Sequence, residues 1–453
     1  MYNLNNLMKN ILYILTFSVL VFYNGFSQNT SVSPIRICNT PKINASYENA
    51  FQAMMQKHQQ FANGKKVAVV YNIPVIFHIV HDGESIGTGR NISQAQIYSQ
   101  IATLNEDYRK MNSDFSSWTT QTNFVNAAAD CEINFCLANI DTNGTTLVEQ
   151  GIDRINRNTK GWNGPSYQGW IEPGGYIDNT LKVGSSWNPT KYLNIWVIEM
   201  NDNVLGYAQF PVIPSGTNPV TDMVGKGKAD NTDGVVLDYR ATGSIGAANA
   251  PFDKGRTATH EIGHWLGLWH INGDVGCGED YCNDTPTQSS LSTTCPATVG
   301  AVVSSGCTAV SPNPPGRMYQ NYMDYSDDKC LVMFTTDQKA RMQAVMANCI
   351  NRFSLTNSTV CTDVGVKENI SNIEMNIYPN PTNEELVVDV NLLVAQDFII
   401  SIVNTLGQTI KEVKQIQSNG GKIKIDLSEK STGVYFVTIK SKSGSKVKRI
   451  VLQ

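Results

Sequence analysis

The feature that most constrains the fold of this chain is the run THEIGHWLGLWHING, which begins at Thr259. The sequence has six histidines, and His260, His264 and His270 all fall within this run. Helical residues four apart project from one face, so the first two imidazoles would lie side by side. Gly267 can take the left-handed conformation that ends a helix, which would bring His270 back towards them. The run therefore predicts a helix, a glycine turn and three converging imidazoles.

Three neutral imidazoles with an open fourth position are the ligand set of a catalytic zinc, because a structural zinc fills all four positions with protein atoms. Such a zinc polarises a carbonyl and lowers the pKa of a water molecule to about 7. Glu261 follows the first histidine and is placed to take the proton of that water and pass it to a leaving amine. A bare HExxH pattern often arises by chance, but Gly267 and His270 at the required spacing disfavour three unrelated histidines.

The N-terminal segment predicts export. A lysine precedes an apolar run at 11–23, and small residues follow it, as in a secretory signal peptide over residues 1–27. The apolar run is short for a membrane anchor, so no transmembrane segment is expected in the mature protein. Residues 28–65 then predict a removable pro-segment with a short helix over 47–61 and an exposed basic site for proteolytic nicking at 64–66.

Residues 66–352 predict one α+β (mixed α/β) domain, because strands and helices alternate with long loops. A long amphipathic helix is expected after Ser93, with Gln96 completing a capping box. Strands are expected where β-branched and aromatic residues concentrate. These strands cover residues 73–80, 193–200, 206–210 and 234–238.

The composition changes near residue 362, where short β-type segments separated by polar turns begin. The segments LVVDV, FIISIVN, KIKIDL and VYFVTIK are typical of an all-β sandwich of about seven strands. We therefore expect a linker at 353–371 and a small β domain at 372–453. The net charge of −4, with no basic stretch, argues against a nucleic-acid partner.

The full HExxHxxGxxH pattern resembles that of the metzincin metallopeptidases, which also carry a methionine turn. The segment 321–326, NYMDYS, looks like that turn. Met323 lies 53 residues after His270, which is too far for a matrixin. The long insert with cysteines, the MDYSDD run and the LGYAQFP strand together resemble the pappalysin group over roughly residues 66–350.

The resemblance implies roles beyond the zinc ligands. Met323 would pack beneath the metal, and Tyr325 would hydrogen-bond the tetrahedral oxyanion, with a core aromatic as the alternative. The strand at 206–210 would bind substrate backbone by β-addition. Asp327 and Asp328 follow the turn where metzincins form the S1′ wall. They would favour Arg or Lys after the cleaved bond unless the neighbouring lysine neutralises them.

The same resemblance implies a calcium site in the loop 273–286, with a solvated acidic loop as the alternative. Its implied ligands are Asp274, Asp284 and Thr285. Cys38 would be a latency switch, its thiolate occupying the fourth zinc position.

Export makes disulfides the expected state of the ten cysteines, so a disulfide partner is the alternative role for Cys38. The implied disulfides join Cys295 to Cys330, and Cys307 to Cys282 or Cys277, although connectivity cannot be derived from sequence.

The C-terminal module carries four motifs in order: NIYPNPTN at 376–383, LGQ at 406–408, GVYFV at 433–437 and a terminal KVKRIVLQ. They closely resemble the C-terminal sorting domain of Bacteroidetes type IX secretion. This implies the type IX secretion machinery as a partner and a secreted or outer-membrane location in a Bacteroidetes-like bacterium. An immunoglobulin-like binding module is the alternative.

The sequence as a whole predicts a secreted zinc endopeptidase made as a preproenzyme. Its substrates would be extracellular proteins or peptides, with Glu261 as the general base. The competing interpretations are a metal-stabilised secreted binding or adhesion protein with an inactive site, which would not need Glu261, and a metzincin that acts on a non-peptide bond.

Overall fold

The computed structural model describes most of the chain after the expected signal peptide, which lies outside the described residues. The described ranges are 36–42, 45–62, 70–119, 122–162, 175–200, 203–215, 218–220, 230–308, 316–361, 373–404, 408–441 and 444–453. The expected nicking site at 64–66 also lies outside them. None of the described helices is both long enough and apolar enough to span a membrane.

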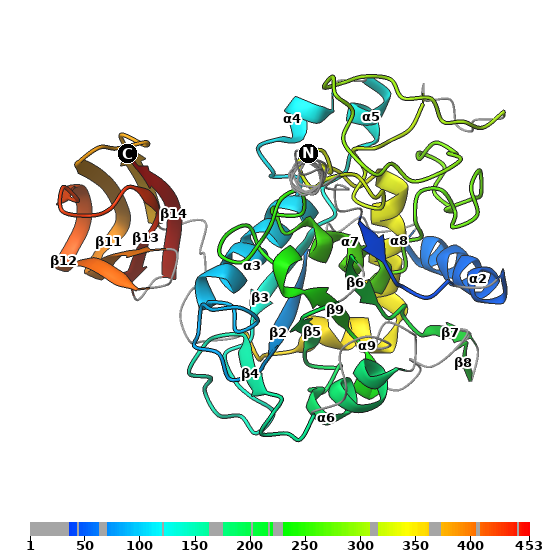
Figure 1. Ribbon diagram of the computed structural model, residues 1–453, viewed down its shortest axis with the longest axis horizontal. Coiled ribbons are helices and arrows are strands. Elements are labelled where there is room, and N and C mark those ends of the chain that lie inside the picture. The colour runs from blue at the N-terminus through cyan, green and yellow to red at the C-terminus, as the bar shows by residue number, and fades with distance from the viewer. Residues whose placement is uncertain are drawn as a thin grey trace, which may run out of the picture. The chain divides into compact units, whose positions relative to one another are not determined.

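A seven-stranded sheet forms the centre of the large domain (Figure 1). Its strands are β1 (Ile37–Cys38), β2 (Tyr71–His81), β3 (Ile133–Leu137), β4 (Ile152–Asn156), β5 (Leu193–Ile198), β6 (Val204–Ala208) and β9 (Val235–Asp238). The order is β1-β6-β9-β5-β2-β3, with β4 also paired to β2. The pairs among β2, β3, β4, β5 and β9 are parallel, and β6 is antiparallel to β9. The four strands expected from the sequence are confirmed.

Both faces of this sheet are covered, as a mainly parallel sheet requires. In β5 the side chains of Ile195 and Val197 enter the main core, whereas Trp196 and Ile198 enter a second core on the opposite face. This alternation follows from the two-residue period of a strand. The main core also takes residues from four helices. These helices are α2 (Ala45–Ala62), α3 (Gln94–Tyr108), α7 (Arg256–Trp265) and α8 (Thr336–Asn348).

The remaining described elements of the large domain are short. They are α4 (Phe115–Trp118), α5 (Thr122–Ala127), α6 (Lys182–Ser185), α9 (Ile350–Phe353), β7 (Ile213–Ser215) and β8 (Asn218–Val220), with η1 (Ile177–Leu181), η2 (Asp230–Thr232), η3 (Tyr239–Ala241) and η4 (Ser354–Asn357). Ser93 caps α3 as predicted, accepting the amide N–H of Gln96 at 3.2 Å. The predicted capping box is wrong, because the Gln96 side chain instead donates to the carbonyls of Tyr239 and Thr242.

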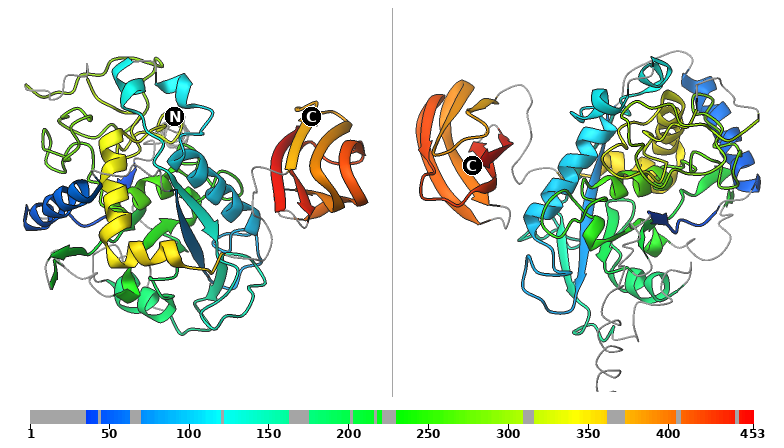
Figure 2. Two further views of the ribbon diagram at one scale, coloured as in Figure 1. Left: turned by 180° about the vertical axis from the view of Figure 1, so that it is seen from behind. Right: turned by 45° about the horizontal axis from the view of Figure 1, so that its top comes forward.

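The C-terminal residues form a five-stranded antiparallel sheet, whose ribbon Figure 2 shows in two views. Its buried side chains make a separate hydrophobic core. Its strands are β10 (Ile373–Tyr378), β11 (Glu385–Asn404), β12 (Thr409–Asp426), β13 (Gly433–Ser441) and β14 (Gly444–Leu452). The first half of β11 pairs with β10 and the second half with β13. The estimate of about seven strands is wrong, because LVVDV and FIISIVN belong to one long strand, β11, which is irregular between Asn391 and Gln396.

Three disulfides tie the large domain together. Cys295 pairs with Cys330 as implied by resemblance, and Cys307 pairs with Cys277. The third, Cys136–Cys361, joins β3 to the end of the domain and was not predicted. Cys282 is buried and free, so its alternative pairing with Cys307 is wrong.

Candidate metal centre

The histidine run folds as its spacing predicts. Helix α7 is buried along its whole length and carries His260 and His264. The helix ends at Trp265, and Gly267 follows with a φ of +88°. A Cβ at Gly267 would lie 2.7 Å from the Phe51 ring, so both the backbone conformation and the space favour glycine there. The turn carries the chain back to His270.

The three imidazoles converge through their Nε2 atoms. Nε2 of His264 lies 3.2 Å from Nε2 of His260 and 3.1 Å from Nε2 of His270. The Nδ1 atoms of His260 and His264 lie 2.7 Å from the carbonyl oxygens of Tyr322 and Leu268. A carbonyl oxygen can only accept, so Nδ1 carries the proton and each of these Nε2 atoms presents a lone pair. Facing lone pairs repel unless a cation lies among them, and the arrangement therefore fits a zinc ion.

Burial keeps the imidazoles of His260 and His264 neutral. It lowers the pKa of His260 well below its ordinary value, and the neighbouring histidines lower it further. Burial likewise lowers the pKa of His264 to about 3, helped by His270. Neutral imidazole is the form that binds a metal.

Glu261 lies beside the imidazoles with only 1% of its surface exposed. Burial raises the pKa of its carboxyl to about 7, although hydrogen bonds from Thr40 and Cys38 oppose the rise. Its Oε2 accepts from the Thr40 hydroxyl at 3.0 Å and the Cys38 thiol at 3.4 Å. Gly206 on β6 makes room for it, because a Cβ there would lie 2.9 Å from Cγ of Glu261. A perturbed, buried carboxyl next to a metal-ligand cluster is typical of a catalytic base.

Cys38 completes the cluster. Among the described residues, one group of three or more His, Cys, Asp or Glu side chains is close enough to share a metal ion: Cys38 with His260, His264 and His270, whose ligand atoms all lie within 4.8 Å of one another. Tyr325 holds the Cys38 backbone, since its hydroxyl donates to the Cys38 carbonyl at 3.2 Å and accepts the Cys38 amide at 3.3 Å.

Met323 packs against α7, and its role in a methionine turn stays a prediction. Its side chain is fully buried, and a Cβ at Gly263 would lie only 2.5 Å from its sulfur. Gly263 is therefore the position that lets the thioether approach the helix between the two histidines. The sequence reasoning did not single out Gly263.

Comparison with known proteins identifies the chain's relatives as metalloproteases. A family model described as "Pregnancy-associated plasma protein-A" matches residues 176–347. An extracellular metalloprotease of Verticillium alfalfae is 30% identical over 276 residues, which are 60% of this chain and 75% of that protein. Mature mirolysin of Tannerella forsythia in complex with a cleaved peptide is 37% identical, covering 63% of this chain and 96% of that one with a TM-score of 0.50.

The chain belongs to the pregnancy-associated plasma protein-A family. It is a zinc metalloendopeptidase with a metzincin-like catalytic domain. A Tannerella forsythia promirolysin mutant is similar as well, at 33% identity, with 70% of this chain and 94% of that chain covered and a TM-score of 0.53. A second family model, "Secretion system C-terminal sorting domain", matches residues 376–453. The enzyme is therefore a secreted or cell-surface protein.

In this family member the edge of the sheet is covered by the expected pro-segment. Strand β1 pairs in parallel with β6, and Cys38 lies opposite Gly206. The Asn39 amide donates to the Gly206 carbonyl at 3.0 Å, and the Thr40 hydroxyl accepts the Ala208 amide at 2.9 Å. The segment thus takes up the backbone groups of the strand expected to bind substrate.

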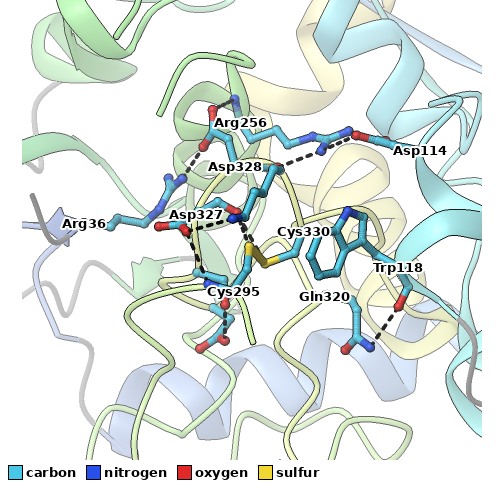
Figure 3. The surroundings of a disulfide bond; sticks show 12 residues. Arg36, Asp114, Trp118, Arg256, Cys295, Gln320, Asp327, Asp328 and Cys330 are labelled. Carbon is cyan, nitrogen blue, oxygen red and sulfur yellow. Dashed lines mark hydrogen bonds and ion pairs between the residues drawn. A yellow bond between two sulfur atoms is a disulfide. The ribbon is translucent and has the colours of Figure 1, made fainter. Parts of the chain in front are cut away.

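Arg36 of this metallopeptidase is buried beside the carboxylate of Asp328, as Figure 3 shows. Its guanidinium donates to the Asp328 carboxylate and to the Thr257 hydroxyl, and it lies over the Phe252 ring. Asp328 also accepts the Arg256 amide at the start of α7, at 3.2 Å.

Asp327 lies beside the Cys295–Cys330 disulfide (Figure 3), where it accepts the Cys295 amide at 3.3 Å. Lys329 is 4.0 Å from Asp327, and its side chain is 59% exposed. This lysine pairs with Asp327, whereas the basic partner of Asp328 is Arg36.

Besides the Arg36–Asp328 pair, helix α2 of the pro-segment contributes a second buried ion pair with the catalytic domain, between Glu48 and Arg341. Glu48 accepts two hydrogen bonds from Arg341, at 2.8 and 3.0 Å, and one from the Trp269 indole at 2.9 Å. Arg341 also donates to the Gly267 carbonyl and lies 3.9 Å from the centroid of the Phe51 ring. The helix therefore rests on the turn that carries the third histidine.

The residues expected to bind calcium are engaged in different contacts. Asp274 accepts a hydrogen bond from His270. The Thr285 hydroxyl contacts the Asp280 carboxylate at 2.8 Å, and Asp284 accepts the Asp337 amide at 2.9 Å. The calcium site stays a prediction for this family member.

Proposed function

We propose that the enzyme hydrolyses internal peptide bonds of extracellular proteins, with Glu261 as the general base. The observation that supports this most strongly is the buried carboxyl of Glu261 beside three converging imidazoles. His260, His264 and His270 would hold the zinc, which when bound supplies a Lewis acid that polarises the scissile carbonyl and acidifies water.

The roles of the surrounding residues follow from their positions. Glu261 takes a proton from the attacking water and delivers it to the leaving amine, and its raised pKa suits both steps. Tyr325 now hydrogen-bonds the backbone of Cys38. With the pro-segment gone, its hydroxyl would be available to donate to the oxyanion of the substrate.

The experiment that tests this function uses the activated protein with a mixed protein substrate. We expect fragments from internal cleavage, identified by mass spectrometry, and about one zinc per chain by elemental analysis. Zinc-free active protein, or fragments trimmed only from chain ends, would contradict the proposal.

We further propose that residues 28–65 keep the enzyme latent until they are removed. Cys38 would supply a fourth ligand to zinc, which favours the thiolate form of a coordinating cysteine. Its sulfur lies within 4.8 Å of the ligand nitrogens of the three imidazoles, and the thiol donates to Glu261. Cys38 would therefore exclude the attacking water from the zinc and occupy the general base at the same time.

The buried Arg36 supports a preference for Arg or Lys immediately after the cleaved bond. Asp328 would lie at the base of this S1′ pocket. Its Oδ2 accepts the Arg256 amide of α7, and its Oδ1 pairs with the guanidinium of Arg36. A substrate side chain with the same charge could take that place once the pro-segment has left.

Substitution Asp328→Asn is expected to remove this preference. The amide keeps an acceptor for the Arg256 backbone but loses the negative charge, so cleavage before Arg should fall about 10- to 100-fold relative to cleavage before Leu. Profiling of cleavage sites in a peptide library would measure the ratio. Asp327→Asn is the matched control, and an equal loss of Arg preference in both variants would argue against Asp328 as the specificity residue.

We propose that the C-terminal module, residues 372–453, directs the protein to the type IX secretion machinery of a Bacteroidetes-like bacterium. Its match to a secretion sorting domain and its separate hydrophobic core support this. The linker would be residues 353–371, and the catalytic domain residues 66–352.

Deletion of residues 372–453 is expected to abolish release from the cell while leaving a folded large domain, because the two cores share no residues. Immunoblots of cells and culture medium would measure this, with the full chain expressed in parallel. Tail-free protein in the medium at the full-length level would show that the module serves another purpose, such as substrate binding.

A structural calcium in the loop 273–286 remains our proposal, with Asp284 and Thr285 as ligands. Carboxylate and hydroxyl oxygens in a tight loop are the ligand types that calcium prefers. An increase in melting temperature on addition of calcium, lost in Asp284→Asn, would support the site.

A further inference from the structure

The three imidazoles of the proposed zinc site differ in the group that faces their Nδ1 atom, the ring nitrogen that points away from the other two histidines. His260 and His264 lie on helix α7, and their Nδ1 atoms face backbone carbonyls. His270 follows the Gly267 turn, outside the helix, and its Nδ1 faces the carboxylate of Asp274. The one ligand that no helix orients is thus the one held by a charged side chain.

The chain between these two residues forms a tight turn. The Gly273 amide donates to the His270 carbonyl at 2.9 Å, and the Asp274 amide donates to the Asn272 side chain at 3.1 Å. Gly273 has a φ of +66°, and a Cβ there would lie 2.5 Å from the carbonyl carbon of Gly278. Asp274 itself has a φ of +62°. The turn folds the carboxylate back onto the imidazole four residues earlier.

The surroundings favour this pairing over a separate metal role for Asp274. Its side chain is 13% exposed, and the carboxylate is bonded to His270. Among the described residues, no second cluster of three or more metal-binding side chains includes it. The pro-segment also contacts this turn, because the Lys42 ammonium donates to the Asp274 carbonyl at 3.1 Å.

We propose that Asp274 is a positioning residue of the zinc centre. Its carboxylate holds the Nδ1–H of His270, so that Nε2 of His270 points at the other two ligands, and its charge strengthens the imidazole as a donor. This inference rests on the proposed zinc ligation by His260, His264 and His270. It replaces a calcium role for Asp274 with a role in zinc binding.

The zinc affinity of the site would therefore depend on Asp274, a residue in a loop. Removing an outer partner of a ligating histidine typically lowers metal affinity by about 10- to 100-fold. Asp274→Ala should show the full loss, because nothing then orients the ring. Asp274→Asn should show a smaller loss, because the amide oxygen can still accept the Nδ1–H but carries no charge.

The test measures zinc affinity of the full-length chain by competition with a chromophoric chelator, and the melting temperature of the zinc-free protein. Glu279→Gln is the matched control, since it neutralises an exposed acid in the same loop. We expect weaker zinc binding in the order Ala, then Asn, with the zinc-free melting temperature and the control unchanged.

Two results would overturn the proposal. One is a zinc affinity of Asp274→Ala within about twofold of wild type, where a loss of about 10- to 100-fold is expected. The other is a lower zinc-free melting temperature in Asp274→Ala together with wild-type zinc affinity in Asp274→Asn, which would make the carboxylate merely structural. If the wild-type chain binds no zinc, the proposed function fails instead, and the two failures are distinguishable.

Discussion

Glu261→Gln is expected to lower peptide hydrolysis by the activated enzyme by about 10²- to 10⁴-fold, the contribution typical of a general acid or base. Glutamine has nearly the same size and hydrogen-bonding reach, but its amide cannot take a proton. The hydrogen bonds that the Glu261 carboxylate accepts come from Thr40 and Cys38 of the pro-segment. The three histidines that would bind zinc are left unchanged by the substitution, so zinc binding and folding should persist in the activated variant.

Turnover of a fluorogenic peptide, together with zinc content and melting temperature, would measure this. Glu279→Gln is again a suitable control, because it makes the same chemical change at an exposed position. Wild-type turnover by the Glu261→Gln enzyme would exclude this residue as the base. Low turnover accompanied by zinc loss would show that the carboxyl serves metal binding.

Glu48→Gln in a pro-segment peptide is expected to weaken its binding to the activated enzyme, because the substitution breaks a buried ion pair with Arg341. Both Glu48 and Arg341 have side-chain exposures of 3% or less. Leaving one partner of such a pair uncompensated costs about 3–5 kcal/mol. A tenfold change corresponds to about 1.4 kcal/mol, so affinity should fall by at least about 10²-fold.

A synthetic peptide of residues 36–62, added in trans to the activated enzyme, would measure this as an inhibition constant. The Cys38→Ala peptide separates the zinc contact from the helix contact, and Gln59→Ala alters an exposed position on the same helix as a control. Equal inhibition by the wild-type and Glu48→Gln peptides would show that α2 contributes little to latency.

The parts of this site that the sequence predicts are those fixed by local geometry. His260, Glu261 and His264 share one helix, and Gly267 determines the turn to His270, so their spacing alone places them together. The β-branched runs likewise predict the strands, because side-chain alternation is a local property.

The parts that the sequence does not predict depend on distant partners. Arg36 meets Asp328 across 292 residues, and Glu48 meets Arg341 across 293. A sequence shows which groups can pair but not which ones the fold brings together. Asp274 illustrates this, because an acid in a glycine-rich loop is equally suited to calcium and to an imidazole, and only the turn at Gly273 directs it to His270.

The Cys136–Cys361 disulfide has a consequence for maturation of the secreted enzyme. It ties the last described residue of the large domain to strand β3, 225 residues earlier in the chain. A new carboxyl terminus created by trimming downstream of Cys361 would stay covalently fastened to the central sheet. Removal of the C-terminal module would therefore not allow the large domain to unfold from its new carboxyl terminus.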